Sequence, residues 1–175
     1  VYKRQGEMIN LTESGYTDGN AKWVLGGKAM IWTSDRAGYR SHGSWGAEDD
    51  IYIMFFDGEA YDKFRLTKEE QALLDEEKED KDKDEKDKDS KKDKDSKKDK
   101  DKDDDKKDEK ADKPVEPLKF DLANRKDRIM RLTVNSSFLG DAVLTQKGDK
   151  LYYCAAFENG YDLWEHNFKE NTTKL

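Results

Sequence analysis

The sequence is poor in the residues that build disulfide frameworks, rigid turns and metal sites. It contains one cysteine, two prolines and two histidines in 175 residues. A single cysteine excludes an internal disulfide, and two histidines leave little material for a metal site or a histidine base. Cys154 has no basic neighbour in its run to activate a thiol, so we expect a small buried side chain there. We predict no metal site and no cofactor.

Long apolar runs and an excess of positive charge are also missing. No run approaches the ~20 residues of a membrane-spanning helix, and residue 1 opens directly into strand-like sequence without a signal-peptide core. We therefore expect a segment of a longer protein, with no membrane span and no signal peptide in this part of it. The net charge of -7 offers no basic surface for nucleic acid.

One stretch accounts for the unusual content of 43% charged residues. From Asp75 to Lys113 every residue except two serines and one alanine is charged. Such a stretch has no apolar surface to bury, and we expect it to be a disordered, solvated tether. Just before it, Thr67 and Glu70 have the spacing of a capping box, which predicts a helix from about Lys68 to about Asp80.

The remaining 136 residues hold every aromatic side chain. The same series of short strand-like segments occurs twice along them. Gly, Asn and Asp turn signals separate the segments, so each copy predicts a four-stranded antiparallel sheet. The predicted strands of the first copy are 21–25, 29–34, 50–55 and 64–67, and those of the second are 141–145, 150–156, 161–166 and 172–175. Residues 1–3 and 8–12 have the pattern of strands from a preceding sheet, and 118–121 and 128–133 that of strands leading into the second copy.

These patterns predict an all-β chain in three parts. Residues 1–67 and 114–175 form the β segments, and 68–113 form a charged insert of helix and disordered chain. An isolated four-stranded sheet leaves two edges and a face uncovered, so we expect neighbouring sheets, as in a β-propeller.

A motif runs through the first copy: Trp23, Gly27-Lys28, Ser34-Asp35-Arg36-Ala37-Gly38, Asp50-Ile51-Tyr52-Ile53-Met54 and Arg65-Leu66-Thr67. Weaker counterparts in the second copy are Gly148-Asp149-Lys150, Leu151-Tyr152-Tyr153 and Asp162-Leu163-Trp164, and 127–132 matches a further strand pattern. The motif resembles the TolB-type repeat of the β-propeller in tricorn-like serine peptidases, which are relatives of the C-terminal-processing peptidases. The insert and residues 39–49 depart from that repeat.

The resemblance implies a partial β-propeller of about two four-stranded blades, plus strands of a preceding blade. It also implies a non-catalytic role in substrate admission or scaffolding for proteolysis, with a peptide or protein substrate as partner. The catalytic residues would lie in a downstream protease domain of the same chain, in the periplasm or at the cell surface. The alternative is a TolB-like propeller for protein–protein interaction without a protease; the oligomeric state stays open.

The loop at 37–48 is the candidate binding element. It is long for a connection between paired strands and carries Tyr39, Arg40, His42 and Trp45 without a periodic reason for burial, which is typical of substrate-binding loops. His42 follows Ser41, but the sequence shows no third orienting group and no oxyanion donor. We therefore assign no catalytic residue and predict that these four side chains contact substrate.

Overall fold

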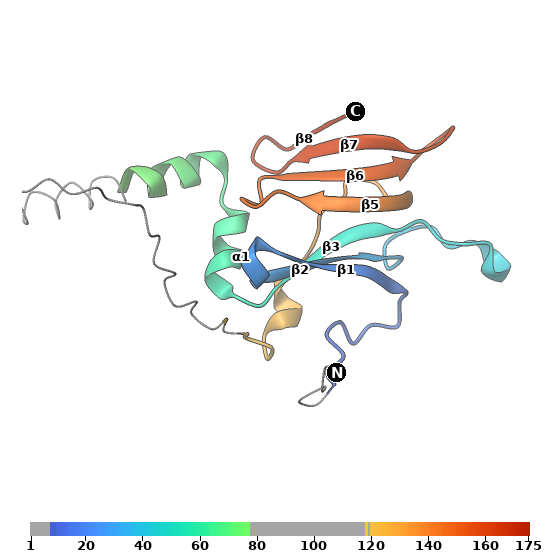
Figure 1. Ribbon diagram of the computed structural model, residues 1–175, viewed down its shortest axis with the longest axis horizontal. Helices are drawn as coiled ribbons and strands as arrows, with labels where there is room; N and C mark the ends of the chain where they lie inside the picture. Colours follow the sequence, from blue (N-terminus) through green and yellow to red (C-terminus); the bar gives the residue numbers. More distant parts are fainter. Residues whose placement is uncertain (1–7, 78–117, 119) are drawn as a thin grey trace, which may run out of the picture. The chain divides into compact units, whose positions relative to one another are not determined.

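The computed structural model describes residues 8–77, 118 and 120–175, and it divides the chain into a unit of 1–65 with 118–175 and a unit of 66–117. The described part of the first unit is mostly β and contains two antiparallel four-stranded sheets without a closed barrel (Figure 1). The first sheet has the order β1 (Asp18–Val24), β2 (Ala29–Ser34), β3 (Asp50–Phe55) and β4 (Ile129–Arg131). The second has the order β5 (Phe138–Leu144), β6 (Lys150–Ala156), β7 (Asp162–Asn167) and β8 (Thr172–Lys174).

Helices are few among the described residues. The helix α1 (Gly58–Arg65) follows β3, and its first turn is capped by Asp57, whose Oδ1 accepts from the Ala60 N–H at 3.0 Å. That bond is the main cause of the lowered pKa of Asp57. Short 3-10 helices lie at Leu25–Gly27, His42–Ser44 and Arg125–Arg128.

The second unit begins with the capping box that the sequence predicts. The Thr67 N–H donates to Glu70 Oε2 at 2.8 Å, and the Glu70 N–H donates to Thr67 Oγ1 at 3.2 Å. Residues 68–77 are helical, which confirms the predicted start of this helix. Its predicted end and the disorder predicted for the stretch beyond 77 fall outside the described residues.

The fourth strand of the first sheet is not where the sequence placed it. Residues 64–67 were predicted as that strand, but Phe64 and Arg65 end α1, because the Asp57 cap starts a helix directly after β3. The fourth strand is β4, whose Arg131 and Met130 pair with Tyr52 and Ile53 of β3. Assigning 128–133 to the entry of the second sheet was therefore wrong, and the charged insert interrupts the first sheet between its third and fourth strands.

Two other strand predictions fail as well. Residues 8–12 form bends and irregular backbone, and the described residues of 118–121 have irregular backbone alone. The predicted strand at 1–3 lies outside the described residues. The limits 1–67, 68–113 and 114–175 for the three parts stay predictions.

A buried carboxylate fixes the returning chain to β3. Asp50 is fully buried, and its two oxygens accept from Thr133 Oγ1 at 2.7 Å and from Ser136 Oγ at 2.8 Å. The Arg131 guanidinium lies 2.7 Å from Asp50 Oδ1. A buried carboxylate is tolerated only with such partners, so Asp50 specifies which segment completes the sheet.

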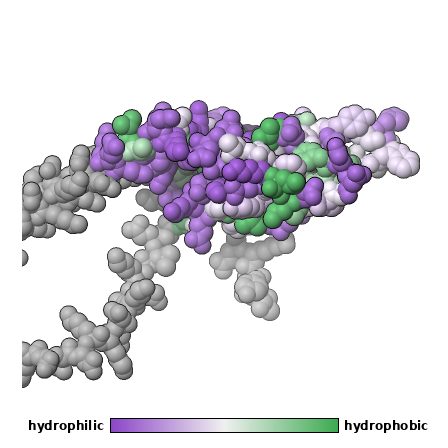
Figure 2. Space-filling model, turned by 90° about the horizontal axis from the view of Figure 1, so that it is seen from above, coloured by the Kyte–Doolittle hydropathy of each residue, from purple (hydrophilic) through white to green (hydrophobic). Residues whose placement is uncertain are grey.

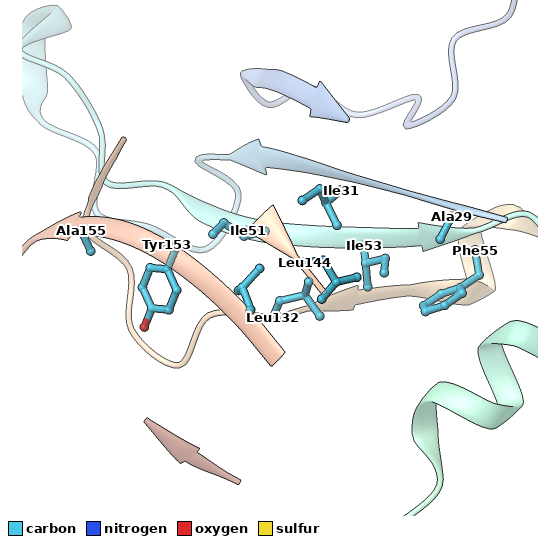
Figure 3. Packing of buried hydrophobic residues seen from close by; sticks show 10 residues of the cluster. Ala29, Ile31, Ile51, Ile53, Phe55, Leu132, Leu144, Tyr153 and Ala155 are labelled. Atoms are coloured by element: carbon cyan, nitrogen blue, oxygen red, sulfur yellow. The ribbon is translucent and has the colours of Figure 1, made fainter. Parts of the chain in front are cut away.

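The main core lies between the two sheets. Figure 3 shows side chains of the first sheet meeting side chains of β5 and β6. The buried members are Ala29, Ile31, Ile51, Ile53, Phe55, Leu132, Leu144, Leu151, Tyr153 and Ala155. A second cluster of Trp32, Tyr52, Met54 and Phe56 covers the opposite face of the first sheet. Because both faces are covered, all six residues of β3 are buried and its sequence does not alternate.

The two sheets repeat each other in detail. The segment Gly19-Asn20-Ala21 in β1 and the segment Gly140-Asp141-Ala142 in β5 each carry a register shift in the pairing with the next strand. Tyr52 of the motif 50–54 and Trp164 of its weaker counterpart 162–164 occupy matching places, since Tyr52 lies opposite Trp32 and Trp164 lies opposite Tyr153.

These matched pairs show how the sheets face each other. The Trp32–Tyr52 pair belongs to the cluster away from the second sheet. The Tyr153–Trp164 pair points into the core shared with the first sheet. The matching faces of the two sheets therefore point in the same direction. The core forms where one face of the first sheet meets the opposite kind of face of the second, so the sheets are related by a head-to-tail repeat and not by a two-fold axis.

Replacing Asp50 with Ala should lower the free energy of unfolding by about 3 kcal/mol, because the Arg131 guanidinium, the buried Thr133 hydroxyl and the half-buried Ser136 hydroxyl all lose their partner carboxylate. Urea unfolding measures the change. The control Asp62→Ala removes an exposed carboxylate of α1 and should change the free energy by less than about 0.5 kcal/mol. Equal values for the two variants would contradict the role given to Asp50.

Candidate functional site

The loop between β2 and β3 folds into a small hairpin, here called the aromatic hairpin (residues 37–48; Figure 1). The Glu48 N–H donates to the Tyr39 carbonyl at 2.8 Å, and the Ser41 N–H donates to the Gly46 carbonyl at 3.1 Å. Gly43 and Gly46 take φ values of 71° and 100°, which lets the chain reverse at the tip. The loop is therefore an ordered projection from the sheet.

Gly38 sets the base of the hairpin. A Cβ at this position would lie 1.7 Å from the Glu48 carbonyl oxygen, so the two arms approach more closely than any side chain allows. This explains in physical terms why the motif at 34–38 ends in glycine.

All four predicted contact residues are exposed on the hairpin. The Tyr39 side chain is 71% exposed and Trp45 is 84% exposed, and His42 is exposed at the tip. Free aromatic rings of this size on an ordered hairpin suit contact with another molecule.

Arg40 is half-exposed and mainly braces the hairpin. Its Nη2 donates to the Asp35 carbonyl oxygen at 3.1 Å and to Asp35 Oδ1 at 3.3 Å. Its guanidinium also lies over the Tyr16 ring at 4.5 Å. The structure thus gives Arg40 a positioning role, and the prediction that it contacts substrate stays a prediction, as it does for the other three residues.

An arginine–aromatic cluster supports the base of the hairpin. The Arg36 guanidinium lies 4.7 Å from the ring centre of Tyr52 and 5.5 Å from that of Trp32. Its Nη2 pairs with Asp18 Oδ1 at 3.4 Å, and the same oxygen accepts from the Trp32 indole N–H at 3.1 Å. Sequence reasoning missed Asp18 and Tyr16, because nothing in their local pattern signals a partner 14 or more residues away.

The pKa values of two carboxyl groups near this cluster are shifted in opposite directions. Burial alone would raise the pKa of Asp18, but hydrogen bonds from Ser34, Ser14, Thr12 and Trp32 lower it to about 2. Burial raises the pKa of Asp49, and the nearby Asp35 and Asp50 add to the shift. Asp18 is therefore a permanent anion beside Arg36, which suits a structural ion pair and not proton transfer near neutral pH.

The two histidines lie in different elements and do not form a common site. His42 is on the aromatic hairpin, whereas His166 is buried in β7 with its Nδ1 2.8 Å from Thr173 Oγ1 of β8. His166 therefore lies on a packed face of the second sheet. Among the described residues no group of histidine, cysteine and carboxylate side chains is arranged to hold a metal ion.

A cavity of about 370 Å³ lies on the face of the first sheet that points away from the second sheet. Its wall includes the apolar side chains Leu11, Met30 and Trp32 and the β1 segment 19–21. No helix in the described part of the chain is long and apolar enough to cross a membrane.

Comparison with known proteins adds no relative: no protein-family model, no curated protein and no solved structure matches the chain. The proposed function therefore rests on the fold, on the geometry of the site and on the resemblance of the sequence motif.

Acidification should weaken the fold through His166. Its pKa is lowered by burial, so the folded state resists the proton that the unfolded chain accepts, and stability falls as the pH drops below the ordinary histidine value of about 6.5. Replacing His166 with Gln should flatten the decline in melting temperature between pH 7 and pH 5. A decline as steep in this variant as in the unmodified chain would contradict this assignment.

Proposed function

We propose that this chain is a non-catalytic β-propeller segment of a tricorn-like serine peptidase, in which it helps to admit and hold peptide substrates. The observation that carries the proposal is the aromatic hairpin, which presents two exposed rings on an ordered, braced projection. The motif resemblance supplies the family, the downstream protease domain and the expected location in the periplasm or at the cell surface.

The stacking of the sheets supports the propeller part of the proposal. Blades of a propeller repeat by rotation about one axis, so every blade presents the same face to its neighbour in one direction. The head-to-tail order of the two sheets meets this condition. The ion pair between Lys22 of β1 and Asp141 of β5 joins the first strands of both sheets, as expected for neighbouring blades in register.

The hairpin is suited to binding an extended or unfolded peptide. Tyrosine and tryptophan offer a large amphipathic contact area and lose little side-chain entropy on binding. The brace from Arg40 to Asp35 and the tight Gly38 base fix the backbone before a ligand arrives, which lowers the ordering cost of the complex. His42 adds a polar group that can bond to peptide carbonyls or side chains.

The alternative function is a protein–protein interaction propeller without a protease. The same exposed rings would then meet a folded partner surface, where tryptophan and tyrosine are typical anchors. The two proposals differ in the ligand: a substrate-admitting hairpin accepts unfolded chains of varied sequence, whereas an interaction module requires one folded partner.

The paired substitution Tyr39→Ala and Trp45→Ala tests the hairpin. We expect at least a tenfold weaker affinity for an unfolded polypeptide such as reduced, carboxymethylated α-lactalbumin, because two anchor side chains of about 1 kcal/mol or more each are lost. Fluorescence anisotropy of the labelled polypeptide measures the affinity. In the full-length protein the same pair should raise the KM for peptide cleavage more than it lowers kcat.

Exposed apolar residues elsewhere provide the control. Val134→Ala with Leu175→Ala removes two side chains that are 55% and 78% exposed and lie outside the hairpin. This control pair should bind as the unmodified chain does. Unchanged affinity of the hairpin variant for the unfolded polypeptide would contradict the substrate role. If the unmodified chain binds a folded partner protein and does not bind unfolded polypeptides, the result favours the alternative.

A further inference from the structure

The connection between β6 and β7 contains the only asparagine–glycine pair of the chain, Asn159-Gly160. Pairing of the two strands stops at Ala155 and Asp162, and residues 157–160 form bends without a hydrogen-bonded turn. Figure 1 shows this connection at the end of the second sheet. The backbone around Asn159 is therefore held less firmly than the strands on either side of it.

The surroundings of the pair are open. Asn159 and Gly160 are both exposed, and a Cβ placed on Gly160 would meet no atom within 4 Å. Among the residues that the structure describes, none forms a hydrogen bond with the Asn159 amide group or with the Gly160 N–H. The side-chain amide and the backbone nitrogen that follows it are therefore free to approach each other.

This proximity permits a reaction within the chain. The Gly160 nitrogen gives its proton to hydroxide and attacks Cγ of Asn159. A bond forms between that nitrogen and Cγ, the bond from Cγ to Nδ2 breaks, and Nδ2 takes a proton from water and leaves as ammonia. Water then opens the five-membered cyclic imide. Attack at Cγ gives aspartate, and attack at the backbone carbonyl carbon of residue 159 gives isoaspartate.

Glycine is the residue that allows this ring closure most readily. It has no Cβ to shield its nitrogen, and its backbone reaches conformations that other residues avoid. Gly160 already has a φ of 130°, which lies in the region that favours glycine. The backbone rotation that closes the ring therefore meets little steric resistance at this position.

Two aspartate–glycine pairs have the same spacing, but the fold makes both unreactive. The pKa of Asp18 is about 2 despite its burial, because of its hydrogen bonds, and the bond from the Ala60 N–H lowers the pKa of Asp57. Both side chains are therefore carboxylate anions near neutral pH, which resist attack by a nucleophile. The amide of Asn159 is neutral at the same pH.

Other asparagines provide the contrast within the same molecule. The Oδ1 atom of Asn167 accepts from the Lys169 N–H at 3.0 Å and from the Glu170 N–H at 3.2 Å, which fixes its side chain. Asn135 is exposed, but the residue that follows it is Ser136, whose hydroxyl donates to Asp50. Neither residue combines a free amide with a following glycine.

We propose that Asn159 is a site of spontaneous deamidation, at which the chain acquires with time a negative charge and an isoaspartyl linkage. This inference is independent of the proposed function. The neighbouring carboxylates of Glu158 and Asp162 are exposed, and Figure 2 shows a surface that is largely hydrophilic. The new carboxylate therefore stays in solvent, and the sheet keeps its pairing, which begins beyond the connection.

Peptide mapping by mass spectrometry of the full chain, incubated at mildly alkaline pH, tests the proposal. The tryptic peptide 151–169 carries both Asn159 and Asn167, and electron-transfer fragmentation distinguishes aspartate from isoaspartate. We expect Asn159 to be converted at least about tenfold faster than Asn167 and Asn135, at a rate that rises in proportion to the hydroxide concentration. The rate should also lie within about threefold of that in a synthetic peptide of residues 155–163, because the fold leaves the pair free.

The variant Asn159→Gln is the matched control. It keeps the amide but would need a six-membered ring, so residue 159 should gain no mass over the same time, and circular dichroism verifies the fold. An Asn159 that stays intact while the synthetic peptide is converted would overturn the proposal, since the fold would then hold the connection. Equal rates at the three asparagines would overturn it as well. Neither result bears on peptide binding by the aromatic hairpin.

Discussion

The first sheet depends on one buried carboxylate. Asp50 begins β3, is fully buried, and takes its hydrogen bonds from Thr133 and Ser136, more than 80 residues later. Folding must therefore bring the chain beyond the charged insert back to β3 before Asp50 is satisfied, at a loop-closure cost that rises only slowly with length. The long insert is tolerated because this contact fixes where the chain returns.

The completed sheet positions everything that the function uses. Its strand β3 is covered on one face by the second sheet and on the other by an aromatic cluster, so the strand is rigidly held. The aromatic hairpin is formed by the connection between β2 and β3. At its base, Arg36 forms an ion pair with Asp18 and Arg40 forms one with Asp35. Rigid support at the base and exposed rings on the hairpin together make a binding element out of a loop.

Sequence patterns predicted the structural features that depend only on residues close together in the chain. The bounds of β2, β3 and β6, the hairpin turns, and the capping box at Thr67 follow from local chemistry, and the structure confirms them. The location of β4 could not be predicted in this way, because the motif 128–133 fits the end of one sheet as well as the start of the next. Only the pairing of Arg131 with Tyr52 and the bonds to Asp50 decide between the two.

The candidate site was predictable in part for the same reason. The length and aromatic content of the loop singled out Tyr39, His42 and Trp45, but the bracing role of Arg40 depends on Tyr16 and Asp35, which only the fold brings together. Likewise, His166 follows Trp164 in an alternating strand, and only the packing of β7 against Phe168 and Thr173 shows that it is buried.

The most direct test of this account is a set of long-range nuclear Overhauser contacts in the intact chain. If β4 completes the first sheet and unlike faces form the core, backbone protons of Met130 contact those of Ile53, and Leu144 methyl protons contact the isoleucines of β2 and β3. Contacts from Met130 to β5 in place of β3, or from Leu144 to Trp32 and Tyr52, would contradict the sheet order and the direction of stacking on which the account rests.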